Sequence, residues 1–456
     1  MARNLKSRLS LIRGRPSHIG EKRGSADPAD AVVFPGWENA GHLVLRRAIR
    51  LPLAFPVPAV LPWTLPAVLP DLLDGESRFP GSGEIPPAAG PLSPEEILFF
   101  DLETTGLSGG AGTVAFLAAF GVFCKESGRG DYAALRVDQF LLLDYPGECD
   151  FLDAVLCFIN ASVDVLNSPK RDPRQVPGDG KRSFRYLATY NGKSFDSQIL
   201  KTRCLLNGFN PPGISQLDLL HPARRMWKRI LPNCSQATVE TMILGLDRGG
   251  DLPGSLAPDI WFDFLKTNGE KSAAERLLGI CDHNVKDITG LASLFSVFTA
   301  IAENPIEASR RFRCDGERLA LIWRREARRK AAPLFRQPFP AGFAFDAAKL
   351  LETAARGYPR SCLRLGFDLF RLGRHEEGRA ALARAAAEDV PWLVPRDNDI
   401  KVLALRSLAV DAERRLGDAE KAAAYVEQAL SAAVSAGSLP RVLLEDLERR
   451  RERLKA

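Results

Sequence analysis

A short apolar run that ends in two acids, residues 97–107, constrains the fold of this chain more than any other stretch. It reads Ile-Leu-Phe-Phe-Asp-Leu-Glu-Thr-Thr-Gly-Leu, and four large apolar residues in a row predict a buried β-strand. Alternate side chains of a strand point to the same face, so Asp101 and Glu103 share one face. Two buried carboxylates repel each other, and hard divalent cations are the simplest compensating charge. The alternative is an acidic strand end that faces water.

A further acid follows a second predicted strand. Residues 184–190 are predicted to form an apolar strand, and residues 197–206 an amphipathic helix. Asp196 therefore lies in the first turn of a helix, at the carboxyl end of a strand, where α/β sheets usually build their sites. The string Gly192-Lys193-Ser194 invites comparison with a phosphate-binding loop, but the glycine that such a loop needs five residues earlier is Leu187.

The last acid lies in a long helical pattern, residues 272–301. His283 and Asp287 are four residues apart, so they share one face of the helix. A lone histidine near an acid is more often a structural pair than a catalyst. Four acids in three ordered contexts favour the catalytic interpretation here.

Together these motifs resemble the DEDD superfamily of 3′-5′ exonucleases, which have an RNase H-like fold, and within it the YprB-type RNase H-like family. The resemblance covers roughly residues 98–296 and includes the strings at residues 107–113, 218–227 and 251–254 (Asp-Leu-Pro-Gly). It implies an α/β fold with a mixed sheet flanked by helices. The predicted order of elements, β-β-β-α-β-α, is compatible with such a sheet, and the motifs carry the assignment.

The resemblance also implies a metal-dependent active site. Asp101, Glu103, Asp196 and Asp287 would hold two divalent cations, Mg²⁺ or Mn²⁺, and His283 would be the general base on the attacking water. His283 stands four residues before Asp287, a spacing typical of the tyrosine branch of that superfamily. The residue types fit independently of the family, because two metals about 3.5–4 Å apart stabilise both oxygens in phosphodiester hydrolysis. Clustered thiolates, which suit softer metals, are absent from the sequence.

Seven further residues are candidates for substrate binding: Thr104, Gly109, Gly110, Asn191, Lys193, Arg224 and Arg225. The two glycines either let a nucleic-acid backbone approach closely or permit a turn with positive φ. The two arginines stand beside Trp227, which combines phosphate-seeking charge with a ring that can stack on a base. The alternative is a helix whose tryptophan is in the core and whose arginines are solvated.

The chain divides into four predicted parts. Residues 1–94 form a basic tail and a Pro-rich arm and linker, residues 95–303 the exonuclease domain, residues 304–344 a basic linker helix, and residues 345–456 an all-α tetratricopeptide-like region. The net charge of +6 is small, but ten basic residues face three acids between Arg310 and Arg336. We expect this segment to guide a nucleic-acid strand, with a solvated linker helix as the alternative.

Similar strings around Gly373 and Gly417 resemble degenerate tetratricopeptide hairpins. These helices either pack on the nuclease domain or bind a protein partner. Eight scattered cysteines without a C-x-x-C pair predict a reducing, cytoplasmic setting. Residues 51–70 are uncharged and as long as a membrane span, but six prolines predict an extended arm and no membrane span. The basic residues of 1–24 are expected to be a solvated terminus, with phosphate contact as the alternative.

We therefore predict a metal-dependent nuclease, a 3′-5′ exonuclease that hydrolyses phosphodiester bonds of single-stranded DNA or RNA, or of a 3′ end, by a two-metal mechanism. One alternative is a catalytically silent nucleic-acid-binding or scaffold protein. The intact acid set argues against it, because a binding module has no need for uncompensated carboxylates at its centre. The other alternative is a structure-selective endonuclease on the same fold, which would use the same metals.

Overall fold

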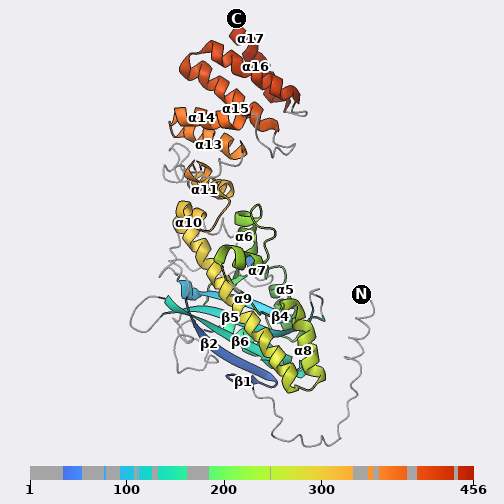
Figure 1. The fold of residues 1–456 in the computed structure, drawn as a ribbon. Coiled ribbons are helices and arrows are strands. Elements are labelled where there is room, and N and C mark those ends of the chain that lie inside the picture. The colour runs from blue at the N-terminus through green and yellow to red at the C-terminus, as the bar shows by residue number, and fades with distance from the viewer. Residues whose placement is uncertain are drawn as a thin grey trace, which may run out of the picture.

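The computed structural model describes residues 34–53, 77–78, 93–106, 110, 112–125, 132–161, 184–246, 248–331, 348–352, 359–387, 398–435 and 440–455. For residues 77–78, 324–331, 359, 398 and 435 it describes the backbone alone. The basic tail, most of the Pro-rich arm and Gly109 lie outside these ranges. Figure 1 shows a large sheet at one end of the molecule and a stack of helices that extends away from it.

The sheet is mixed, and its described strands run in the order β1-β2-β6-β5-β4-β7-β8-β3. The strands are β1 (Glu38–Gly41), β2 (Val44–Pro52), β3 (Ser77–Arg78), β4 (Ile97–Thr104), β5 (Ala115–Lys125), β6 (Tyr132–Leu142), β7 (Tyr186–Thr189) and β8 (Ser215–Asp218). Central β4 pairs antiparallel with β5 and parallel with β7. The predicted mixed sheet is confirmed, and the strand with the first two acids lies at its middle.

The outer strands β1 and β2 were not predicted, because their residues fall in the segment assigned to a tail and linker. β2 pairs antiparallel with β6 along its whole length. The arginines of β2 interrupt the apolar pattern by which a strand is predicted. In the structure they are paired with residues of the neighbouring strand: Arg46 Nη2 lies 2.6 Å from Asp138 Oδ1 on β6. The assignment of residues 1–94 to a tail and linker is therefore corrected for residues 38–52, and the other predicted boundaries stay predictions.

Alternate residues of β4 face two different apolar cores. Ile97 and Phe99 pack in one core with α6 (Leu220–Trp227) and the second half of α9 (Lys271–Glu303). Leu98, Phe100 and Leu102 pack in the other core with α3 (Glu148–Ile159), α5 (Asp196–Leu206) and α8 (Ala257–Lys266). By the same alternation Asp101 and Glu103 continue the face of Ile97 and Phe99, which is the face toward α9.

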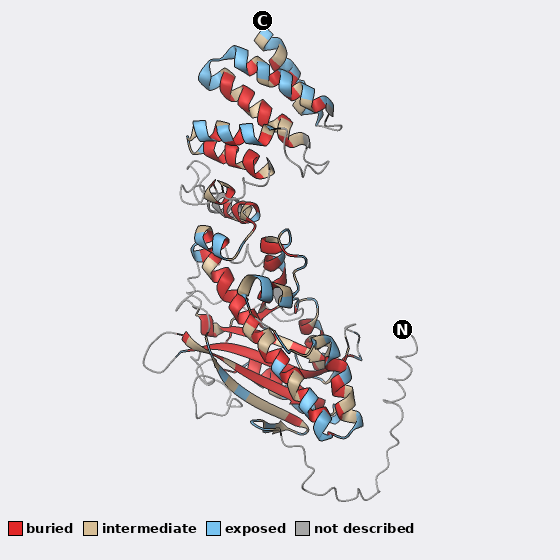
Figure 2. Ribbon diagram, viewed as in Figure 1, coloured by how far each residue is buried: buried red, intermediate tan, exposed pale blue. Residues whose placement is uncertain are grey.

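Helix α9 crosses the sheet and brings His283 and Asp287 close to β4. Gly121 on β5 allows the close approach, because a Cβ there would lie 2.5 Å from Ile288 Cγ2. By length and composition α9 resembles a membrane span, but 78% of its most apolar window is buried inside the protein. Figure 2 shows the buried residues along this helix and the central strands. Packing against the sheet therefore accounts for the hydrophobicity of α9.

The core does not stop where α9 ends. The same apolar cluster continues through Leu319 and Trp323 of α11 (Gly316–Ala331) to Leu365 of α13 (Pro359–Arg371) and Leu382 of α14 (His375–Ala386). Ion pairs of the buried Glu317 cross the same region: its carboxylate lies 3.0 Å from Arg229 Nη1 and 2.9 Å from Arg364 Nη1. The first C-terminal helices are thus packed against the sheet domain.

The stack in Figure 1 also contains α10 (Pro305–Arg311), α15 (Asn398–Asp411), α16 (Ala419–Ser435) and α17 (Arg441–Lys455), whereas the short α7 (Gln236–Val239) lies beside the sheet domain. Gly373 joins α13 to α14 with φ +77°, and Gly417 precedes α16 with φ +65°. These left-handed turns are the positions that favour glycine. The predicted helical C-terminal region is confirmed, and its tetratricopeptide character stays a prediction.

Candidate active site

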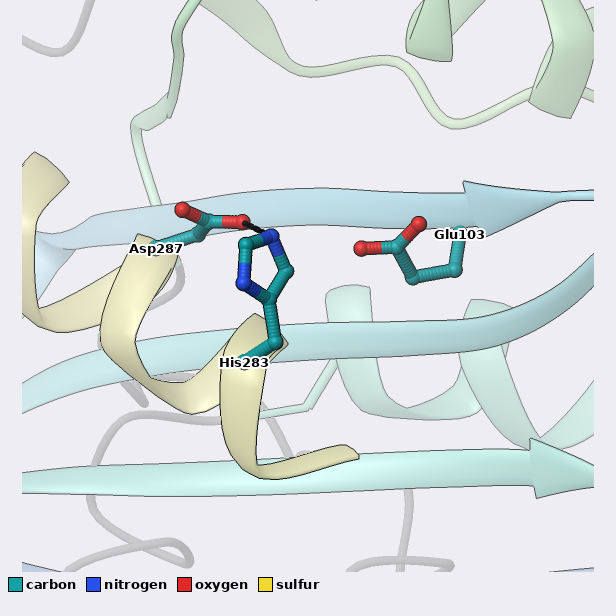
Figure 3. Close-up of side chains that lie close together, drawn as sticks. All are labelled: Glu103, His283 and Asp287. Carbon is teal, nitrogen blue, oxygen red and sulfur yellow. Dashed lines mark ion pairs between the residues drawn. The ribbon is translucent and has the colours of Figure 1, made fainter. Parts of the chain in front are cut away.

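The structure brings all four predicted acids and the predicted histidine together. Asp101 and Glu103 project from β4, and His283 and Asp287 lie one turn apart on α9. Asp196 is the first residue of α5, which follows β7 beside β4. Ligand atoms of Glu103, His283 and Asp287 lie within 4.8 Å of one another. Figure 3 shows the imidazole ring between the two carboxylates.

Burial and mutual repulsion raise the pKa values of these carboxyl groups. Burial, then the charges of Asp287, Asp196 and Glu103, raise the pKa of Asp101 well above its usual range. Burial and Asp287 raise the pKa of Glu103 to about 8, although His283 opposes the rise. Burial and a further acid, Asp218, raise the pKa of Asp196 to about 7. A buried site with this surplus of carboxylates and oxygen donors fits hard divalent cations.

His283 is held between two carboxylates. Its Nδ1 lies 2.8 Å from Asp251 Oδ2, and its Nε2 lies 3.2 Å from Asp287 Oδ2. Burial lowers the pKa of His283, but the hydrogen bonds and charges of Asp287 and Asp251 outweigh that effect and raise it to about 9. Without a cation, the ring is therefore protonated at neutral pH and neutralises part of the acidic cluster.

Arg248 was not predicted, because a lone arginine in a loop has no pattern in the sequence. Its Nε donates to Glu240 Oε2 at 2.5 Å, and its guanidinium also donates to Asp287 Oδ1. Gln236 Nε2 donates to the Asp287 carbonyl oxygen at 2.7 Å and to Glu240 Oε1 at 2.8 Å. Burial raises the pKa of Glu240 to about 7 despite the opposing charge of Arg248. Arg248 thus holds one oxygen of Asp287 while His283 faces the other.

Gly290 on α9 leaves the space that Glu240 occupies, since a Cβ there would lie 1.7 Å from Glu240 Oε1. We expect Gly290→Ala to lower the free energy of unfolding by about 1–3 kcal/mol through overpacking, even though alanine favours a helix over glycine by about 1 kcal/mol. In a Glu240→Ala background the same substitution should become neutral or stabilising. Urea unfolding of the four proteins measures both effects, and an equal cost in both backgrounds would contradict this packing.

Asn284 fixes the orientation of Asp101. Its Nδ2 donates to Asp101 Oδ2 at 2.6 Å, and its Oδ1 accepts from Gln139 Nε2 at 2.9 Å. Gln139 Oε1 accepts in turn from Arg47 Nε at 2.7 Å. A chain of hydrogen bonds therefore runs from the outer strand β2 through β6 and α9 to the acid on β4. Asn284 adjoins His283 in the sequence, but only the fold shows which acid it contacts.

Asp218, at the end of β8, organises the loop that precedes Asp196. Its carboxylate accepts the backbone N–H groups of Asn191 at 2.8 Å, Lys193 at 3.3 Å and Leu220 at 3.1 Å. Asn191 adopts φ +62° to make this turn. The backbone N–H groups of Asn191 and Lys193 thus fix the shape of this loop. Substrate binding by their side chains stays a prediction.

Two other predicted substrate residues, Thr104 and Gly110, lie at the end of β4 and in the segment that follows it. Thr104 is buried and its Oγ1 donates to the Gly106 carbonyl oxygen at 3.0 Å, which shapes the turn after β4. Gly110 is exposed, with open space where a Cβ would lie.

On α6, Arg224 is exposed and Arg225 is half-buried. Trp227 is fully buried and its Nε1 donates to the Phe312 carbonyl oxygen at 2.9 Å. Trp227 is therefore a core residue, as the alternative held, and not a stacking platform. Substrate binding by the arginines stays a prediction.

Comparisons with known proteins agree with this architecture. The sequence profile of the RNase H superfamily matches residues 158–299, which contain Asp196, His283 and Asp287. The chain is also 34% identical over 202 residues to YprB of Bacillus subtilis (strain 168), an uncharacterized protein. That match covers 44% of this chain and 41% of YprB, so less than half of the relative is aligned. The sheet and the helices that cover it therefore have an RNase H-like fold, and the chain is similar to YprB over part of its length.

Proposed function

We propose that this protein is a metal-dependent nuclease, and that it removes nucleotides from the 3′ end of single-stranded DNA or RNA. The observation that carries the proposal is the convergence of Asp101, Glu103, Asp196 and Asp287, where burial first and neighbouring acids second raise the pKa values of the first three. A protein that only binds nucleic acid gains nothing from such a cluster, which costs stability unless cations neutralise it.

The four acids would hold two divalent cations, which would polarise the phosphate and make water a stronger nucleophile when bound. The protein's own groups do the rest. Asn284 and Arg248 keep Asp101 and Asp287 in place through their hydrogen bonds. His283 presents Nε2 to Asp287, in the cluster that it forms with Glu103, and in its neutral form that atom accepts the proton of the attacking water.

The test is degradation of end-labelled single-stranded DNA and RNA with Mg²⁺ or Mn²⁺, comparing the wild type with Asp101→Ala/Glu103→Ala. We expect mononucleotides to be released progressively from the 3′ end by the wild type alone. Internal fragments, or cleavage of a circular strand, would show an endonuclease on the same fold. Binding without cleavage across metals and substrates would instead support the scaffold alternative.

A further inference from the structure

The loop of residues 251–254, Asp-Leu-Pro-Gly, encloses the imidazole of His283 on two sides. Asp251 Oδ2 lies 2.8 Å from Nδ1. On the other side, a Cβ at Gly254 would lie 2.9 Å from Nε2. Glycine is therefore needed at position 254, because any side chain there would press on Nε2, the nitrogen that faces Asp287. The loop therefore bonds Nδ1 through Asp251 and leaves space for Nε2 at Gly254.

The loop is seated on α9 one turn before the histidine. A Cβ at Gly279 would lie 2.6 Å from Leu252 Cδ1, so the leucine packs directly on the helix backbone at this point. Gly279 and His283 are four residues apart and share a helix face. Leu252 thus docks on the same face that presents the imidazole, which places the carboxylate of Asp251 at Nδ1.

Both oxygens of Asp251 have cationic partners on α9. Oδ2 lies 2.8 Å from His283 Nδ1, and Oδ1 lies 3.2 Å from Lys286 Nζ. Arg248, three residues before Asp251, places its Nη1 3.8 Å from Oδ2. A carboxylate held at both ends cannot rotate away from the ring without losing one of these contacts. Asp251 is therefore a fixed acceptor for the Nδ1 proton.

We infer that Asp251 is a positioning residue for His283, an inference that rests on the proposed function. A neutral imidazole has one N–H donor and one acceptor nitrogen. A carboxylate at Nδ1 selects the tautomer with the proton on Nδ1, and it fixes the plane of the ring. Nε2 is then the acceptor nitrogen, on the side of the ring that faces Asp287 Oδ2 at 3.2 Å. Asp251 acts on the reaction only through His283.

This inference predicts a specific pattern of turnover. Asp251→Ala should lower kcat by about 10–100-fold, a part of the roughly 10²–10⁴-fold that a positioned general base contributes, and leave KM close to that of the wild type. Asp251→Asn, which keeps an acceptor oxygen, should recover part of the loss. In a His283→Ala background, Asp251→Ala should have no further effect on kcat. The matched control is Asp263→Ala, which removes an acid paired with Lys266 and Arg276 at the surface of α8.

A second readout does not depend on turnover. In the metal-free protein labelled with ¹⁵N-histidine, the Nδ1 proton of His283 should be shifted downfield and protected from exchange by the Asp251 carboxylate. The signal should persist in Asp251→Asn and disappear in Asp251→Ala. The chain has five histidines, which keeps the spectrum assignable.

The outcomes separate the two proposals. A wild type that does not hydrolyse any strand overturns the proposed function and this inference with it. If the wild type is active and His283→Ala slows it, but Asp251→Ala keeps full kcat or retains the Nδ1 signal, the positioning role alone is overturned. A loss in Asp251→Ala that adds fully to that of His283→Ala would also overturn it, because the acid would then act by another route.

Discussion

Asp101→Asn is expected to lower hydrolysis of a labelled single strand by at least about a hundredfold, because a metal site contributes several kcal/mol to the transition state and each 1.36 kcal/mol is tenfold in rate. The same variant should be more stable than the wild type when metal is absent. Burial and three neighbouring acids act on the Asp101 carboxyl. Asparagine keeps its shape and an oxygen that can accept from Asn284, while the repulsion is removed.

Kinetics with Mg²⁺ and urea unfolding in EDTA measure the two effects. The matched control is Asp282→Asn, which changes the acid next to His283 in the sequence. The Asp282 carboxylate is 67% exposed and lies 2.7 Å from Arg47 Nη2, at the surface of the domain. Exposed ion pairs contribute about 0–1 kcal/mol, so this variant should keep both activity and stability. A metal-free Asp101→Asn protein that is less stable than the wild type would contradict the repulsion argument.

The acids were predictable from the sequence because two regular periods place them. The strand period puts Asp101 and Glu103 on one face, and the helix period puts His283 and Asp287 on one face. The buried strand and the long helix around them are strong apolar patterns, and both occur in the structure. Local pattern therefore determines which side chains point inward, and the sheet order then brings Asp196 beside them.

The partners of these residues were not predictable, because they come from loops and from distant segments. Asn284 and Asp101 are 183 residues apart, and Arg248 and Asp287 are 39 apart, yet each pair shares a hydrogen bond. No local period relates such positions; their contact depends on how α9 and the loop pack on the sheet. β2 was not predicted for a related reason: its arginines are unfavourable in a buried strand until β6 lies beside it and supplies their partners.

Divalent cations are expected to stabilise this protein more at about pH 8.5 than at about pH 6. The pKa of Glu103 rises from an ordinary 4.5 to about 8, and that of Asp196 from 3.8 to about 7. Between the ordinary and the raised pKa of each group, the folded protein binds more protons than the unfolded chain. The stability of the metal-free protein therefore falls as the pH rises through this range, up to about pH 8. The pKa of His283 rises from 6.5 to about 9, so the stability it contributes below pH 6.5 is also lost as the pH rises through 9.

A cation must displace those protons, so it binds more weakly where the carboxyls are protonated. At a hundred times its Kd, one bound ion adds about 2.7 kcal/mol to the free energy of unfolding, or a Tm rise of roughly 5–10 °C for a domain of this size. Thermal unfolding with EDTA and with Mn²⁺ across this pH range measures the difference. Asp101→Asn/Glu103→Gln should show a smaller Mn²⁺ effect and a flatter pH dependence without metal. An equal Mn²⁺ shift at both pH values would mean that the cation does not compete with protons at these acids.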